Sequence, residues 1–320
     1  MKPLSDVGEI GLLRAILPTL RQRRDVARGP GDDCAVLRLP DSPFDLLATT
    51  DPVIEGRHYL PDTPLALVAR KAVARALSDL AAMGGTPRWL LTDVTAAPDT
   101  PADKVSALYA GLEKAARHFH VSIVGGDLAE ARELQVHIVA LGTCPRGTAV
   151  LRSTARPGDL LLVTGRLGAS WADGNLHQFT FLPRLAQGRW LAQNGYATAM
   201  MDLSDGLGAD LPRLLDASGD LGCLIRPDAI PCSPFARRLG GSPERAIARA
   251  WNDGEDFELL LAIRPRRLPQ LLQDWAAAFP RLPLTPIGQV LPPSEPRVLL
   301  SPDGTSRPFP KGGFDHFSQA

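Results

Sequence analysis

The chain has 320 residues, 44% hydrophobic and 22% charged, with 35 basic and 35 acidic side chains and a formal net charge of zero. This composition predicts a folded protein of two domains or one large domain, without the charge bias of a nucleic-acid-binding or acidic-membrane-binding protein. No apolar run nears the roughly 20 residues of a membrane span, and the N-terminus MKPLSDVGEI lacks the apolar core of a signal peptide. The four cysteines form no C-x-x-C pair. We therefore expect a cytoplasmic protein with reduced cysteines.

The first half of the chain predicts alternating helices and strands. Apolar residues at helical spacing indicate the helices, and short apolar runs indicate the strands. The expected elements are a helix over 5–20, strands over 34–39 and 44–48, a helix over 64–83, a strand over 89–94, a helix over 102–118 and strands over 121–124 and 134–141. These elements indicate an α/β domain over residues 1–145.

A turn-rich link over 143–158 leads to a second block of the same kind. Its expected elements are a strand over 159–164, a strand over 197–203, a helix over 206–217, a strand over 256–263, a helix over 268–279 and a strand over 285–290. Residues 174–183 have no clear assignment. We therefore expect a second α/β domain over residues 146–320 and mixed sheets in both domains.

Carboxylates recur beside glycine, serine or threonine at the predicted ends of elements. The opening example is Thr49-Thr50-Asp51, which follows the apolar strand 44–48. Asp79 is unusual because it lies among apolar residues of a predicted helix, where an unpaired carboxylate costs free energy. Each Asp beside Gly is by itself first a turn residue. The whole set indicates binding of a polyvalent cation, and it comprises Asp32, Asp33, Asp51, Asp79, Asp127, Asp202, Asp205, Glu255 and Asp256.

The sequence contains no G-x-x-x-x-G-K-[ST] motif, so a P-loop is not expected. Many carboxylates without that motif favour a nucleotide bound through magnesium ions that bridge its phosphates. A structural calcium site is the alternative, although the EF-hand spacing is absent and the acids are scattered along the chain. Among the histidines only His58, in a loop after Gly56, has a position that indicates a site.

The motifs together resemble the thiamine-monophosphate kinase family, in the family's order and over nearly the whole chain. They are GDDCAVL at 31–37, TTDPVIEGRHYLPD at 49–62, LSDLAAMGGTPRW at 77–89, VGGD at 124–127, RSTARPGDLLLVTG at 152–165, MDLSDGL at 201–207, GEDFELL at 254–260, IGQV at 287–290 and GGFDHF at 312–317. The resemblance implies an aminoimidazole-ribotide-synthetase-like fold with two α/β domains, a homodimer formed through the strands of the N-terminal domain, and a site completed by the C-terminal domain.

The resemblance also implies a direct, magnesium-assisted transfer of the γ-phosphoryl group of ATP to thiamine monophosphate, without a catalytic side-chain nucleophile. The implied magnesium ligands are Asp33, Thr49, Thr50, Asp51, Asp79, Asp127, Asp202 and Asp205. The implied ATP contacts are Gly126, Asp127, Arg152, Ser204 and Tyr109. The implied contacts to thiamine monophosphate are His58, Glu255 and Phe314, with Phe314 stacking on the thiamine.

Several positions depart from the family's pattern. The usual GGDTT is GGDLA here, so Leu128 replaces a threonine, and GGED is DGED. The tract over 166–183 is shortened, and the C-terminal aromatic residue is Phe314. Two alternatives stay open: another ATP-using enzyme of the same superfold, such as an amidine synthase or a selenophosphate synthetase, and a non-catalytic protein that binds nucleotide or thiamine phosphate.

Overall fold

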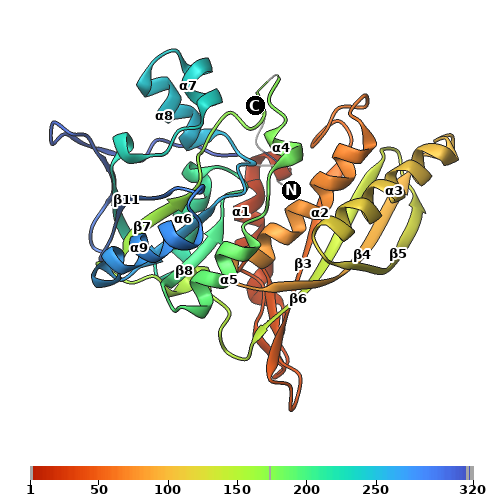
Figure 1. Cartoon of the computed structure of the whole chain (residues 1–320), viewed down its shortest axis with the longest axis horizontal. Helices are drawn as coiled ribbons and strands as arrows, with labels where there is room; N and C mark the ends of the chain where they lie inside the picture. The colour runs from red at the N-terminus through yellow and green to blue at the C-terminus, as the bar shows by residue number, and fades with distance from the viewer. Residues whose placement is uncertain (1–2, 173, 315–316, 318–320) are drawn as a thin grey trace. The chain divides into compact units, whose positions relative to one another are not determined.

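The computed structural model describes residues 3–172, 174–314 and 317 (Figure 1). By its internal contacts the chain forms two compact units that interleave in the sequence. The first unit comprises Asp33–Val150 and Leu176–Gly195, and the second comprises Met1–Asp32, Leu151–Asn175 and Tyr196–Ala320. In the part of the chain that is described, no helix has both the length and the hydropathy needed to cross a membrane.

The first unit contains a mixed sheet of long strands. Its order is β2 (Ala35–Leu37), β3 (Phe44–Ile54), β6 (Gln135–Pro145), β4 (Thr86–Ala96) and β5 (Ser122–Glu130). The β4–β5 pair is parallel and the other pairs are antiparallel. Its helices are α2 (Leu65–Ala82), α3 (Ala102–His118), α4 (His177–Thr180) and α5 (Leu185–Gln193).

Helices α2 and α3 lie side by side on one face of this sheet (Figure 1). Helix α2 is rich in alanine, leucine and valine, follows Pro64 and ends before Gly84, as the sequence predicts. The strand residues beneath the helices, such as Leu47, Leu90 and Ile138, are fully buried. The core of the first unit therefore lies between α2 and the central strands.

The second unit contains a seven-stranded sheet. Its order is β13 (Ser306–Pro308), β12 (Arg297–Leu300), β9 (Gly222–Ile225), β11 (Leu284–Leu291), β7 (Leu160–Thr164), β10 (Leu259–Ile263) and β8 (Ala197–Asp202). Only β12 and β9 pair in parallel among these strands. The unit also holds α1 (Leu4–Ile16), β1 (Val26–Arg28), α6 (Leu207–Ala217), α7 (Pro234–Gly240), α8 (Pro243–Asn252) and α9 (Leu268–Ala278), with short 3₁₀ turns at Leu17–Thr19, Arg152–Thr154, Pro227–Ala229 and Pro265–Arg267. Both units therefore have the predicted α/β class with mixed sheets.

Two of the predicted strand ends that proved wrong fall at candidate site residues. Strand β3 does not end before Thr49 but continues to Ile54, because it pairs with β6 along its whole length. Strand β5 likewise runs through Gly125, Gly126 and Asp127, which pair with β4. The threonines and acids at these positions therefore project from extended strands and not from turns. The sequence also left β9, α7, α8, β12 and β13 unassigned, and α4 lies within the unassigned tract 174–183.

Candidate active site

The segment that begins at Thr49 is bound to α2 by polar side chains on successive turns of the helix. The Thr49 hydroxyl donates to the Asp79 carboxylate at 2.5 Å, and the Arg75 guanidinium donates to the Asp51 carboxylate at 3.2 Å. Carboxylate oxygens of Asp33 and Asp79 lie within 4.8 Å of each other. This is a cluster of oxygen ligands of the type that magnesium prefers. Of the eight predicted ligands, the first unit brings Asp33, Thr49 and Asp79 together, and Asp51 lies two residues beyond Thr49 on the same strand, paired with Arg75.

His58 lies at the far end of the same segment and is buried, with 4% of its surface exposed. Its Nδ1 accepts a hydrogen bond from the backbone N–H of Ile54 at 3.0 Å, so Nε2 is the ring nitrogen able to donate. Its backbone carbonyl accepts from the Lys71 ammonium at 2.7 Å. Lys71, Arg75 and Asp79 are spaced i, i+4 and i+8, so one stripe of α2 contacts the segment at three points.

Asp127 is not part of this cluster within one chain. Strands β6 and β4 lie between β3 and β5, so three inter-strand spacings, about 14 Å in total, separate Asp51 from β5. Asp127 pairs in register with the exposed Asp93, whereas Asp51 pairs with the fully buried Ile138. Residues in register point to the same face of a sheet, so Asp51 and Asp127 lie on opposite faces.

Gly126 permits a close approach of the two parallel strands. A Cβ at this position would lie 2.0 Å from the carbonyl oxygen of Thr92 on β4. The neighbouring Leu128, which departs from the family's pattern, is 61% exposed on the edge strand. This part of β5 therefore presents both backbone groups and an exposed apolar side chain at the edge of the sheet.

Thr50 and Tyr109 also lie away from the acidic cluster. Thr50 is exposed and alternates with Thr49 and Asp51, so its side chain lies on the sheet face opposite the helices. Tyr109 lies on α3, where Gly111 packs against Ala66 and Ala69 near the start of α2. Asp79 is ten helical residues beyond Ala69, about 15 Å along the axis. The structure of the first unit therefore separates Tyr109 from Asp79.

In the second unit, Arg152 is held by Asp32. The Asp32 carboxylate accepts from the backbone N–H of Arg152 at 3.2 Å, and its oxygen lies 3.7 Å from the Arg152 Nε. The Asp32 side chain is 1% exposed. Asp32 therefore orients the turn that carries the predicted nucleotide-binding arginine.

The loop between β8 and α6 carries Asp202, Ser204 and Asp205. Asp202 is buried at the end of β8. The Asp205 carboxylate accepts from Arg213 at 2.5 Å, and Arg213 also donates to the fully buried Asp210 at 2.7 Å. The two carboxylates raise the pKa of Arg213, although burial alone would lower it. Asp205 thus has a fixed cationic partner, as Asp51 has in the first unit.

The two predicted substrate contacts of the second unit attach to neighbouring carbonyls of that loop. The backbone N–H of Glu255 donates to the Ser204 oxygen at 2.7 Å, and that of Phe314 donates to the Asp205 oxygen at 2.9 Å. Glu255 is buried, whereas Phe314 is 41% exposed. The second unit therefore brings Ser204, Asp205, Glu255 and Phe314 together. Asp315 and His316 of the GGFDHF motif lie outside the described residues.

The backbone around Glu255 is strained. Glu255 and Phe257 have φ of +61° and +51°, a region that residues other than glycine seldom adopt. Between them the Asp256 carboxylate accepts from the Gly168 N–H at 2.9 Å and from the Ser170 hydroxyl at 2.5 Å. Burial raises the pKa of Asp256 well above its usual value. Strain of this kind gathers at functional sites and persists because surrounding contacts hold it.

Sequence reasoning did not assign roles to Lys71, Arg75, Asp210 or Arg213, and it included Asp256 only in the general set of candidate acids. A usable signal was present for two of them. Arg75 and Lys71 stand about one and two turns before Asp79 in a largely apolar helix, where charged side chains need partners.

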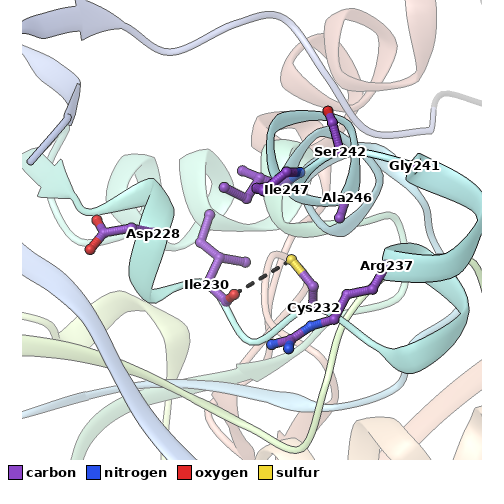
Figure 2. A pocket seen from close by; sticks show the side chains of 9 residues that line it. Asp228, Ile230, Cys232, Arg237, Gly241, Ser242, Ala246 and Ile247 are labelled. Carbon is purple, nitrogen blue, oxygen red and sulfur yellow. Dashed lines mark hydrogen bonds between the residues drawn. The ribbon is translucent and has the colours of Figure 1, made fainter.

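A separate cavity of about 440 Å³ lies in the second unit between α7, α8 and the turn at Pro227–Ala229. Figure 2 shows Ile230, Cys232, Ala246 and Ile247 lining its apolar part, with the Cys232 thiol donating to the Ile230 carbonyl at 3.6 Å. None of the predicted site residues lines it. The cavity is therefore distinct from the groups described above.

Comparison with known proteins bears on both the fold and the family. Residues 31–144 match the family model "AIR synthase related protein, N-terminal domain", which agrees with the expected fold. The solved structure of AaThiL complexed with AMPPCP and TMP is 28% identical, covers 99% of both chains and has a TM-score of 0.81.

Curated relatives match nearly the whole chain. The thiamine-monophosphate kinase of Bacillus subtilis strain 168 is 29% identical over 97% of this chain and 100% of its own. The thiamine-monophosphate kinase of Escherichia coli strain K12 is 33% identical over 97% of this chain and 98% of its own. The resemblance found in the motifs is thus confirmed over the full length, and the chain belongs to the thiamine-monophosphate kinase family.

Proposed function

We propose that this protein transfers the γ-phosphoryl group of ATP to thiamine monophosphate, producing ADP and thiamine diphosphate. The observation that carries the proposal is the 33% identity to a thiamine-monophosphate kinase over nearly all of both chains. The relative AaThiL, complexed with AMPPCP, an ATP analogue, and with TMP, supports this pair of substrates. The paired acids and cations described above suit a site for phosphorylated ligands.

The chemistry requires no protein nucleophile. An oxygen of the acceptor phosphate attacks the γ-phosphorus, the bond from that phosphorus to the β-phosphate oxygen breaks, and ADP leaves with the electron pair. Because the second pKa of a phosphate monoester is near 6, the attacking oxygen is largely ionised at neutral pH. The protein therefore acts by positioning the two phosphates and by offsetting their charge.

The acids of the site fit magnesium. Asp33 and Asp79 place carboxylate oxygens within 4.8 Å of each other, and the Thr49 hydroxyl adjoins them, so hard oxygen donors dominate the set. When bound, magnesium supplies positive charge that offsets the charge of the polyphosphate. The proposed ligands within one chain are Asp33, Thr49, Asp51, Asp79, Asp202 and Asp205. Thr50 and Asp127, which lie on the opposite face of the sheet, are proposed as metal ligands together with a second copy of the chain.

The remaining roles divide between the two substrates. Arg152, oriented by Asp32, suits contact with the nucleotide phosphates because a guanidinium donates in a bidentate manner. The further proposed nucleotide contacts are Gly126, Asp127, Ser204 and Tyr109, and the proposed acceptor contacts are His58, Glu255 and Phe314. In this scheme the domain over residues 1–145 binds metal and ATP and dimerises, and the domain over 146–320 completes the nucleotide and acceptor sites.

The uncovered face of the first unit's sheet supports a homodimer. Trp89 is 42% exposed there, and Leu91 and Val139 of the same face are partly exposed, although an uncovered sheet face is normally polar. Val124 and Leu128 on the edge strand β5 are 55% and 61% exposed. An apolar face beside an unpaired strand edge is typical of an interface. If a second copy of the chain bound to this surface, Asp127 of one protomer could contribute to the site of its partner.

We propose a cytoplasmic location because ATP and phosphorylated acceptors are available there, and the four free, buried cysteines agree with a reducing compartment.

The deciding experiment follows thiamine diphosphate formation by the purified protein with ATP, magnesium and thiamine monophosphate. Formation of one ADP per thiamine diphosphate is the expected result. Absence of product with both ligands still bound would instead identify a binding protein, and turnover of ATP with a different acceptor would identify another enzyme of this superfold.

A further inference from the structure

Lys71 is a fully buried lysine that the proposed chemistry does not use. It lies on α2, and none of its surface is exposed. An ammonium group removed from water costs free energy unless hydrogen-bond acceptors surround it. A fully buried lysine in a helix composed mainly of alanine, leucine and valine therefore indicates a specific role.

The Lys71 ammonium joins two segments that are distant in sequence. It donates to the His58 carbonyl oxygen at 2.7 Å and to the Oε1 of Gln178 at 2.9 Å. It also lies 5.1 Å from the centre of the Phe179 ring, a cation–π contact. Because both oxygens contact one nitrogen, the His58 loop and α4 are direct neighbours at this point.

Arg70, the residue before Lys71, binds the α4 segment to α2 at a second point. Arg70 donates to the carbonyl oxygens of Phe179 at 2.8 Å and Phe181 at 2.7 Å. Gln178 and Phe179 are buried. Residues 178–181, which lie in the tract shortened relative to the family, are thus held against α2 by two adjacent cations.

The Lys71 contact completes the attachment of His58. The His58 N–H donates to the Ile54 oxygen at 2.8 Å, and its Nδ1 accepts from the Ile54 N–H. These bonds close the turn on itself, and the bond from Lys71 to the His58 carbonyl ties that turn to α2. Loss of the ammonium would free the turn and leave two buried oxygens without this donor.

We propose that Lys71 is a positioning residue for the acceptor. By joining the His58 turn to residues 178–181, it makes residues 178–181 a wall of the site for thiamine monophosphate. This inference rests on the proposed function, because His58 is an acceptor contact only in that scheme. The recognised ligand is the phosphorylated acceptor, and the nucleotide is not expected to depend on Lys71.

The test compares Lys71→Met with Val73→Ala, a change at a fully buried apolar residue of the same helix. Titration with thiamine monophosphate alone, without ATP or magnesium, gives a readout independent of turnover. Lys71→Met is expected to raise the Kd and the KM for thiamine monophosphate at least tenfold and to change the KM for ATP less than twofold. Val73→Ala is expected to lower the Tm and leave both constants within twofold of wild type.

A second pair of variants keeps the test valid if Lys71→Met does not fold. Gln178→Leu removes the acceptor and is expected to weaken thiamine monophosphate binding several-fold, whereas Gln178→Glu retains an acceptor and is expected to bind as wild type does. Unchanged binding in Gln178→Leu, or equal weakening in Val73→Ala and Lys71→Met, overturns the role of Lys71. A wild-type protein that binds thiamine monophosphate but forms no product overturns the proposed function instead, so the two failures are distinguishable.

Discussion

The Arg75 guanidinium lies 3.2 Å from the Asp51 carboxylate, and the two side chains are only 10% and 19% exposed. A predicted magnesium ligand is therefore already neutralised by an arginine of the neighbouring helix. Such a pair has two effects: it stabilises the fold while no cation is bound, and it competes with the cation for the same carboxylate.

Arg75→Gln should therefore change magnesium dependence and stability in opposite directions. Loss of the competing cation should lower the magnesium concentration for half-maximal turnover several-fold. Loss of the partner of Asp51 should destabilise the magnesium-free protein by about 1–3 kcal/mol, with added magnesium restoring part of that loss. Thermal unfolding with and without magnesium measures the second effect. Arg38→Gln, which breaks the Arg38–Asp45 pair elsewhere in this unit, is the matched control and should leave magnesium dependence unchanged.

Asp79→Asn should weaken magnesium binding while preserving the local fold. The amide is nearly isosteric and its oxygen still accepts from the Thr49 hydroxyl, but the charge beside Asp33 is lost. We expect activity at limiting magnesium to fall by about two orders of magnitude or more, because a metal-linked charge is removed from the phosphoryl-transfer site. Asp103→Asn, an exposed position in the first turn of α3, is the control. Equal magnesium affinities in calorimetric titrations of wild type and Asp79→Asn would contradict the ligand assignment.

Mixing two inactive variants tests whether Asp127 serves the partner's site. Asp51→Asn and Asp127→Asn are each expected to be inactive alone, because each removes a proposed ligand. If Asp51 of one protomer works with Asp127 of the other, a hybrid dimer contains one intact site. An equimolar mixture that exchanges subunits freely should then recover about a quarter of wild-type activity. A mixture that exchanges subunits, as seen by mass spectrometry of tagged chains, but stays inactive would assign Asp127 to its own chain.

Gly313→Ala should displace the C-terminal tail. Gly313 has a φ of +86°, and a Cβ there would lie 2.3 Å from the Ala209 Cβ and 2.9 Å from the Asp205 oxygen. The left-handed conformation alone costs an alanine about 1–2 kcal/mol, and the clash adds to this. The bond from the Phe314 N–H to Asp205 should break, so the KM for thiamine monophosphate should rise about as much as in Phe314→Ala. Gly304→Ala, at a positive φ with open space around it, controls for backbone strain. A normal KM in Gly313→Ala would separate the tail from acceptor binding.

Ionisation of Asp45 should make part of the free energy of unfolding sensitive to acid. Hydrogen bonds from Arg38 and from the Gly147 N–H hold the pKa of Asp45 below its usual value. A carboxyl whose folded pKa is depressed stabilises the fold above its unfolded pKa, and this stabilisation is lost as the pH falls through the folded pKa. Asp45→Asn should therefore be less stable than wild type at pH 7, and the difference should shrink below about pH 4. Urea unfolding at both pH values measures it, and a difference that does not depend on pH would contradict the assignment.

The sequence by itself determined the fold class, the family and most of the regular elements. Helices α2 and α3 and strands β7 and β11 were predictable because local hydrophobic periodicity and glycine or proline boundaries specify them. The motifs identified the candidate acids without any knowledge of their neighbours.

Only the tertiary structure decided which of those residues work together. Pairing with β6 extends β3 through Asp51. The strand order separates Asp51 from Asp127, although both residues belong to motifs that are equally recognisable in the sequence. Likewise, the sequence marks Lys71 as a charged residue of a largely apolar helix, but only the tertiary structure shows that its partners are the His58 carbonyl and Gln178. Strand order, sheet face and burial depend on contacts between residues far apart in the chain, which a local pattern does not encode.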